Sequence, residues 1–220
     1  MMIELESNNS VSATSRLWQL REVDENLVAG IAREHELPEI IARVLVARGI
    51  ATEATADFLN PTLRSFLPDP SHLLDMDKAA KRIADAISAK EKIAIFGDYD
   101  VDGATSSALL ARYFRTLGIS PVLYIPDRML EGYGPNTKAL LALRAQGVVL
   151  TITVDCGTLA FEPISAAKNA GMDVIVVDHH IGEARRPEAF AIINPNRLDE
   201  TSPHRQLAAV GVAFLLLVAL

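Results

Sequence analysis

The chain has 220 residues, half of them hydrophobic and 5% aromatic, which suits one α/β domain with an aliphatic core and an amino-terminal appendage. Its net charge of −7 argues against gripping nucleic acid by bulk electrostatics, because phosphate contacts come from Lys and Arg. The single cysteine, Cys156, excludes an intrachain disulfide and fits a reducing, cytoplasmic compartment. The start of the chain lacks a signal peptide pattern. The longest apolar run, residues 207–220, is typical of a buried helix rather than a membrane span.

The first 70 residues are predicted to form an amino-terminal region distinct from the rest. Its polar start, residues 1 to about 15, has the composition of a disordered tail. Two short helices are expected, at residues 39–48 and at 52–59 with Thr52 as the cap. A proline-rich connector at 67–71 then places the domain boundary near residue 70, so that residues 71–220 form the main domain.

The main domain alternates regularly between helical and strand-like segments. Helices are predicted at residues 76–90, 104–117, 137–146 and 163–169. Short apolar strands are predicted at residues 93–96, 122–125, 148–154, 174–177 and 191–193. This order predicts an α/β fold with a mostly parallel sheet and helices on both of its faces.

Three carboxylates follow the first strand of this sheet. Asp98, Asp100 and Asp102 stand at alternate positions, and alternate side chains of an extended segment point the same way. Three anions that converge repel one another unless a cation lies among them, and oxygen ligands suit Mg²⁺ or Mn²⁺. The alternative is a solvated acidic loop whose aspartates cap the next helix.

Two further strands end in residues that can bind a metal. Asp155 follows the third strand, and Asp178, His179 and His180 follow the fourth. Ligands bind beyond the carboxyl ends of the strands in open α/β sheets, so these side chains are expected near the first acidic group. A mixture of carboxylate and imidazole ligands suits Mn²⁺, while Mg²⁺, Co²⁺ and Zn²⁺ stay open.

These motifs resemble those of the DHH phosphoesterases, and within that family the branch of 5′ to 3′ exonucleases specific for single-stranded DNA. The resemblance covers most of the chain. It is carried by Gly97-Asp98-Tyr99-Asp100-Val101-Asp102-Gly103-Ala104-Thr105-Ser106, Pro126-Asp127-Arg128, Gly132-Tyr133-Gly134, Thr153-Val154-Asp155-Cys156-Gly157, Val177-Asp178-His179-His180 and Ala191-Ile192-Ile193-Asn194-Pro195-Asn196. The implied reaction is the metal-dependent attack of water on a phosphodiester.

The resemblance also implies roles for single residues. The metal ligands would be Asp100, Asp102, Asp155 and His179, with Asp98 as a further contributor and Asp155 as the bridge between two Mn²⁺ or Mg²⁺ ions. His180 would contact phosphate or transfer a proton, and Asp178 would orient a histidine, the alternative being a turn-capping carboxylate. Arg128 would clamp a phosphate oxygen, the alternative being a surface ion pair with Asp127 or Glu131.

One family motif has no counterpart in this sequence. A fourth metal-binding Asp is expected beyond the helix around residues 211–214, but no Asp occurs after Asp199 and the sequence ends at Leu220. We therefore expect a fragment with an incomplete catalytic domain that is inactive, or nearly so, by itself. The expected partners are single-stranded DNA and, by resemblance, a helicase or a single-strand-binding protein, with no membrane.

Two other functions stay open at this point. The first is hydrolysis of a small substrate such as pyrophosphate, polyphosphate or a short oligonucleotide. Many relatives of that kind carry a His four residues before the Asp-x-Asp pair, where this chain has Phe96, and this favours the exonuclease branch. The second is a scaffold that keeps the fold and has lost activity, against which the retained Asp and His residues argue.

Overall fold

The computed structural model describes residues 21–220, so the predicted disordered tail at residues 1–15 lies outside the described part. The chain divides between Leu67 and Pro68 into two compact units. Among residues 21–220, no helix combines the length and the apolar character that a membrane crossing needs.

The amino-terminal unit is a small helical cluster. Its helices are α1 (Glu25–Glu34), α2 (Glu39–Ala47), the 3₁₀ turn η1 (Thr52–Ala54), α3 (Thr55–Leu59) and α4 (Leu63–Phe66). Asp24 caps α1 by accepting hydrogen bonds from the backbone of Asn26 and Leu27. Residues 52–59 are helical as predicted, as the 3₁₀ turn η1 followed by α3, but the prediction that Thr52 is the cap was wrong, because η1 begins at Thr52 and Ala51 precedes it.

The second unit contains a five-stranded sheet in which all paired strands are parallel. The strands are β1 (Ile93–Gly97), β2 (Val122–Tyr124), β3 (Leu150–Val154), β4 (Asp173–Val177) and β5 (Ala191–Ile193), in the order β2-β1-β3-β4-β5. The helical elements are η2 (Pro70–His72), α5 (Met76–Ser88), α6 (Val101–Thr116), α7 (Thr137–Ala145), α8 (Phe161–Asn169) and α9 (Ala209–Ala219). The predicted fold class is confirmed.

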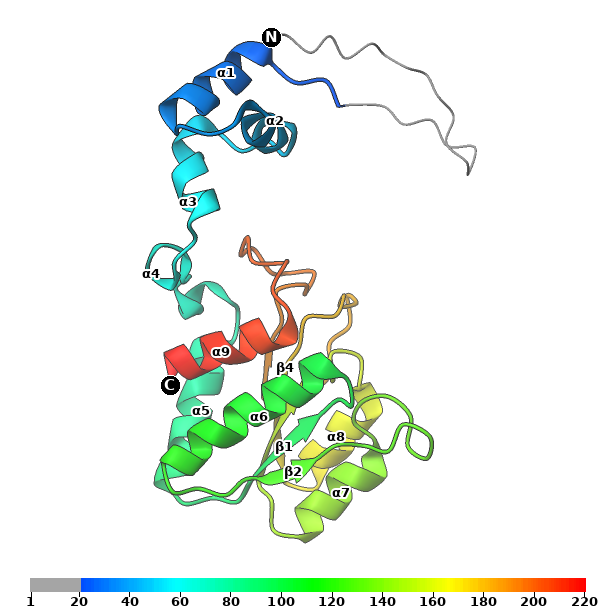
Figure 1. Cartoon of the computed structure of the whole chain (residues 1–220). Helices are drawn as coiled ribbons and strands as arrows, with labels where there is room; N and C mark the ends of the chain where they lie inside the picture. The colour runs from blue at the N-terminus through cyan, green and yellow to red at the C-terminus, as the bar shows by residue number, and fades with distance from the viewer. Residues whose placement is uncertain (1–20) are drawn as a thin grey trace, which may run out of the picture. The chain divides into compact units, whose positions relative to one another are not determined.

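Helices cover both faces of this sheet, as Figure 1 shows. One apolar core joins α5, α6 and α9 to residues of β1, β3, β4 and β5 that include Ile95, Ile152 and Ile175. A second core, which includes Phe96 and Val176, joins α7 and α8 to the opposite face. Because both faces are covered, the residues of β1, β3 and β4 are buried almost throughout, including the two threonines of β3, Thr151 and Thr153.

The register of the sheet decides which residues meet at its carboxyl edge. Gly97 of β1 pairs with Val154 of β3, and Val154 pairs with Val177 of β4. The next residue on each strand is an aspartate, so three aspartates leave the sheet at the same level. Parallel strands all end at one edge, so this edge brings the three aspartates together.

Candidate metal centre

The turn from β1 into α6 presents two of the predicted acidic residues. Asp98 is 4% exposed, and burial raises the pKa of its carboxyl. Asp100 is the amino-terminal cap of α6, where Oδ1 accepts hydrogen bonds from the backbone N–H of Asp102 and Gly103 at 2.9 and 3.0 Å. The Gly103 N–H is the main reason that the pKa of Asp100 is lowered. One oxygen of Asp100 is thus used structurally, and the other is left for a ligand.

The start of α6 corrects one step of the sequence argument. The helix begins at Val101, three residues before the predicted start, because Asp100 caps it. Asp102 therefore lies in the first helical turn, and the argument from alternate positions in an extended segment does not apply to it. The turn is compact, since a Cβ at Gly103 would lie only 2.5 Å from the backbone oxygen of Asp98.

Asp155 is the most unusual carboxylate of the site. It follows β3 in a left-handed backbone conformation with φ of 61°, and it is 1% exposed. Neither of its carboxylate oxygens accepts a hydrogen bond from any residue between 21 and 220. Burial and the neighbouring Asp100 carboxylate raise the pKa of Asp155 to about 8. An ionised Asp155 is therefore a buried anion that lacks compensation from the described protein groups.

Asp178 occupies the equivalent position after β4 and is equally buried, but its carboxylate is fully used. Oδ2 accepts the backbone N–H of Thr158 at 3.0 Å, and Oδ1 accepts those of His179 and His180 at 2.7 and 3.2 Å. Oδ1 also lies 2.7 Å from Nδ1 of His180. Although burial opposes it, this set of hydrogen bonds lowers the pKa of Asp178 to about 2. Both oxygens of this carboxylate already accept hydrogen bonds, so it orients its neighbours.

The two histidines face the buried anion. Nε2 of His179 lies 3.3 Å from Oδ1 of Asp155, outside hydrogen-bond geometry. His180 directs Nδ1 at Asp178, and this contact raises the pKa of its imidazole. With Nδ1 held in this way, Nε2 is the nitrogen of His180 that remains for a ligand or a proton.

Five of the predicted side chains form two groups that share one member. One ligand atom from each of Asp98, Asp100 and Asp155 lies within 4.8 Å of the others, and the same holds for Asp155, His179 and His180. Asp155 belongs to both groups, which is the position that a bridging ligand would take. The orphaned oxygens of Asp155 and the mixed oxygen and nitrogen donors fit a pair of divalent cations such as Mn²⁺.

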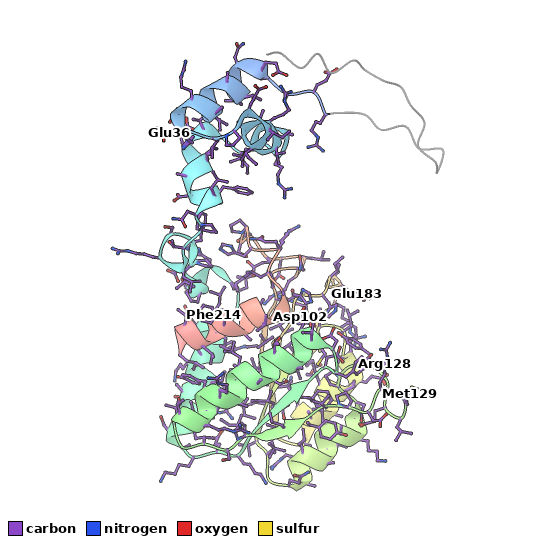
Figure 2. The ribbon with its side chains drawn as sticks, viewed as in Figure 1. Glu36, Asp102, Arg128, Met129, Glu183 and Phe214 are labelled. Atoms are coloured by element: carbon purple, nitrogen blue, oxygen red, sulfur yellow. The ribbon has the colours of Figure 1, made fainter. Side chains whose placement is uncertain are left out.

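Besides Asp178, two predicted residues lie outside these groups. Asp102 is at the start of α6, and Arg128 is on the loop between β2 and α7 (Figure 2). The guanidinium of Arg128 stacks on Tyr99 at 4.9 Å from the ring centroid. In the described chain, Arg128 makes no ion pair with Asp127 or Glu131 within 4.0 Å. The ligand role of Asp102 and the phosphate role of Arg128 stay predictions.

The sequence argument gave no role in this centre to several neighbouring side chains. The Tyr133 hydroxyl donates a hydrogen bond to the backbone oxygen of Asp155 at 3.0 Å and lies 3.3 Å from Nδ1 of His180. Asn194 and Asn196 donate to the backbone oxygens of His180 and His179. Both asparagines stand in one of the motifs that carried the family resemblance, but nothing in the motif indicates which atoms they contact.

The comparisons with known proteins identify the family. Residues 92–219 match the family described as "DHH family, N-terminal domain". This match covers more than half of the chain, so the chain belongs to the DHH family.

Its relatives include exonucleases named RecJ. The chain is 38% identical over 208 residues to the single-stranded-DNA-specific exonuclease RecJ of Bacillus subtilis, a match that covers 94% of this chain and 26% of the relative. It is also 38% identical over 201 residues to RecJ of Escherichia coli, which covers 91% of this chain and 33% of the relative. The chain thus spans about a quarter to a third of these curated relatives.

Solved structures lead to the same family. RecJ from Thermus thermophilus in complex with Mn²⁺ matches with a TM-score of 0.73 and 26% identity, over 91% of this chain and 28% of that one. An exonuclease RecJ bound to manganese matches with a TM-score of 0.61 and 32% identity, over 67% of this chain and 37% of that one. The fold observed here is therefore one that binds manganese in those relatives.

Proposed function

We propose that this chain is the catalytic part of a metal-dependent exonuclease that hydrolyses single-stranded DNA from its 5′ end. The observation that carries the proposal is the buried carboxylate of Asp155, which lacks a described hydrogen-bond donor and belongs to both groups of metal-binding side chains. The relatives named RecJ support the choice of substrate. The proposed catalytic domain is residues 71–220.

The proposed site would hold two divalent ions, Mn²⁺ or Mg²⁺. Asp98 and Asp100 would provide oxygens for one ion, His179 would provide a nitrogen for the other, and Asp155 would bridge them; we retain Asp102 as a further ligand. When bound, such a pair activates water near neutral pH and stabilises the charge of a phosphodiester under attack. The choice between the metals rests on the imidazole, which favours Mn²⁺.

The remaining groups would act on the substrate directly. Arg128, held against the ring of Tyr99, would bind a non-bridging phosphate oxygen through its guanidinium. Because Asp178 holds Nδ1 of His180, Nε2 is the nitrogen that would donate a proton to phosphate or to the leaving oxygen. Asp178 would hold that imidazole in the orientation required.

The proposal includes the cellular compartment and the protein partners. A single, fully buried cysteine suits a reducing cytoplasm, where we place the protein. A helicase and a single-strand-binding protein remain proposed partners, because an exonuclease of this kind needs a source of exposed single strands.

The substrate assay should use the protein that carries this sequence. Its substrates are a 5′-labelled single strand, the matched duplex and inorganic pyrophosphate, each with Mn²⁺, Mg²⁺ or a chelator. We expect stepwise loss of nucleotides from the 5′ end of the single strand, with no hydrolysis under chelation. Faster hydrolysis of pyrophosphate than of DNA would instead support the small-substrate function. Mn²⁺ binding without hydrolysis of any substrate would support the inactive scaffold.

A further inference from the structure

We propose that Asn194 and Asn196 are positioning residues. They fix the orientation of His179 and His180 in the metal centre by donating hydrogen bonds to the backbone carbonyls of the two histidines. The inference rests on the proposed metal site and assigns a task to side chains that lie one layer behind it. Both asparagines belong to the loop that follows β5, a strand that contributes none of the proposed ligands.

Each asparagine holds one histidine. Nδ2 of Asn196 donates a hydrogen bond to the backbone oxygen of His179 at 2.6 Å. Nδ2 of Asn194 donates to the backbone oxygen of His180 at 2.8 Å, and also to Oγ1 of Thr158 at 2.8 Å. The two amides are linked, since the backbone N–H of Asn196 donates to Oδ1 of Asn194 at 2.8 Å.

The opposite side of the histidine pair is held by Asp178. Its Oδ1 accepts the backbone N–H groups of both His179 and His180. The two residues have four backbone hydrogen-bonding groups, and each of the four is bound to a side chain. The peptide planes of the pair are thus set by neighbouring side chains and not by sheet hydrogen bonds, because β4 ends at Val177.

The chemistry of these contacts requires an amide. Asn194 is completely buried, donates through Nδ2 to two oxygens and accepts at Oδ1, so its amide can point in only one way. A carboxylate of the same shape has no donor, and it would place an oxygen against the carbonyl of His180. An apolar side chain of similar size would leave that carbonyl unbound.

The loop itself is anchored by other residues. Arg197 is 6% exposed and donates to the carboxylates of Asp75 and Asp199 and to the backbone oxygen of Ile192. The Glu200 carboxylate accepts the backbone N–H of Leu74. These contacts attach the loop to β5 and to the residues that precede α5 without using the asparagine amides. Nδ2 of Asn196 also donates to the backbone oxygen of Arg205 at 3.2 Å, a longer contact than the one with His179.

The expected consequence concerns metal affinity. Nε2 of His179 lies 3.3 Å from Asp155, so a small tilt of its peptide plane moves the imidazole out of the ligand group. Groups that orient metal ligands in this way change affinity by about 10- to 100-fold when they are removed. The side chain of Asn196 is partly exposed, which makes its replacement less disruptive than that of Asn194.

The test measures Mn²⁺ binding by calorimetry to the chain and to Asn196→Leu and Asn196→Asp, together with thermal unfolding without metal. The two replacements differ in charge, and both lack the donor. We expect each to weaken Mn²⁺ binding by about 10-fold or more, with an unfolding midpoint within a few degrees of the unchanged chain. If charge alone mattered, Asn196→Asp would bind Mn²⁺ more tightly and Asn196→Leu would bind it equally well, which would overturn the inference.

The matched control is Thr158→Val. It removes the other acceptor of the Asn194 amide and the contact of the Thr158 hydroxyl with Asp178, but it leaves in place the backbone N–H that Thr158 donates to Asp178 and the contact of Asn194 with the carbonyl of His180. We expect it to lower the unfolding midpoint with less than a threefold change in Mn²⁺ affinity, whereas Asn194→Leu should weaken binding as Asn196→Leu does. Losses of affinity that follow the losses of stability across all four variants would overturn the positioning role. If the unchanged chain bound no Mn²⁺, the proposed metal site itself would fail.

Discussion

Two aspartates follow neighbouring strands of the same sheet, and their surroundings are opposite. Asp155 follows β3 and Asp178 follows β4, and each is 1% exposed. The carboxylate of Asp178 accepts hydrogen bonds from three backbone N–H groups and contacts an imidazole, which lowers its pKa to about 2. The carboxylate of Asp155 has no such donor among the described residues, and its pKa is raised to about 8.

This difference separates two uses of a buried charge. Asp178 is an anion that the protein itself compensates, so it stabilises the loop and orients His180. The ionised form of Asp155 destabilises the metal-free protein, which is why its pKa is raised, and a divalent cation would remove that penalty. The same residue type at the same level of the sheet thus serves the structure in one case and the proposed chemistry in the other.

The replacement Asp155→Asn should have the largest effect on activity. It removes the shared ligand of both groups, so in the protein that carries this sequence hydrolysis of single-stranded DNA in Mn²⁺ should fall by about 1,000-fold or more. The metal-free protein should be as stable as before, or more stable, at pH 8 because a buried charge is gone. Activity assays and thermal unfolding in a chelator measure the two effects. Retained activity would show that Asp155 is not the ligand shared by the two metal ions.

Asp178→Asn should instead act on stability. The neutral amide loses the charge-assisted contact with His180 and weakens three hydrogen bonds with the backbone, so we expect a loss of about 2–3 kcal/mol in the free energy of unfolding. Urea denaturation at pH 7 checks this value. If the Asp178→Asn protein were as stable as the unchanged protein, Asp178 would not have the stabilising role that distinguishes it from Asp155.

Asp102→Ala tests the ligand that the structure leaves outside both groups. If Asp102 is a further ligand, its loss should lower Mn²⁺ affinity by about 10- to 100-fold without unfolding the domain. The matched comparison is Asp77→Ala, which changes an exposed carboxylate in the first turn of α5. Equal Mn²⁺ affinity in both variants would mean that Asp102 is not a metal ligand.

The pH dependence of metal-free stability should have opposite signs at the two sites. An unfolded Asp has a pKa of about 3.9. Asp155 has a raised pKa, so its contribution to stability is present below about pH 4 and is lost as the pH rises through about 8. Asp178 has a lowered pKa, so its contribution is present above about pH 4 and is lost as the pH falls through about 2. Unfolding measurements on both Asn variants and the unchanged chain separate the two ranges.

Tyr133→Phe should have the smallest effect. The Tyr133 hydroxyl connects the two strand ends, because it donates to the backbone oxygen of Asp155 and lies close to His180. Its removal should reduce stability by about 1 kcal/mol and change DNA hydrolysis by several-fold. A loss of activity as large as that of Asp155→Asn would show that Tyr133 takes part in the reaction.

The sequence predicted the sheet because its strands are short, apolar and separated by helical patterns. It also predicted that Asp98, Asp155 and Asp178 follow strand ends, since each comes directly after an apolar run. It could not assign their different roles, because these depend on the donors that surround each carboxylate. Those donors come from Thr158 and from the histidines' own backbone, and their positions follow from the register between β3 and β4.

Other differences between the prediction and the structure have local causes. Asp100 starts α6 at Val101, and this moves Asp102 onto a helix. Helix α1 is not among the elements predicted from the sequence, although Asp24 caps it and Val28 and Ile31 are its buried residues. The contacts of Asn194 and Asn196 with the histidines join segments 14 to 17 residues apart through a loop, which no periodic pattern reveals.

The most direct test is a crystal structure grown in Mn²⁺, with anomalous scattering used to locate the metal. We expect manganese peaks in contact with the carboxylate of Asp155 and no peak in contact with that of Asp178, whose hydrogen bonds should be unchanged. Manganese bound to Asp178, or a metal site that leaves Asp155 without a cation, would contradict the different roles proposed for these two aspartates.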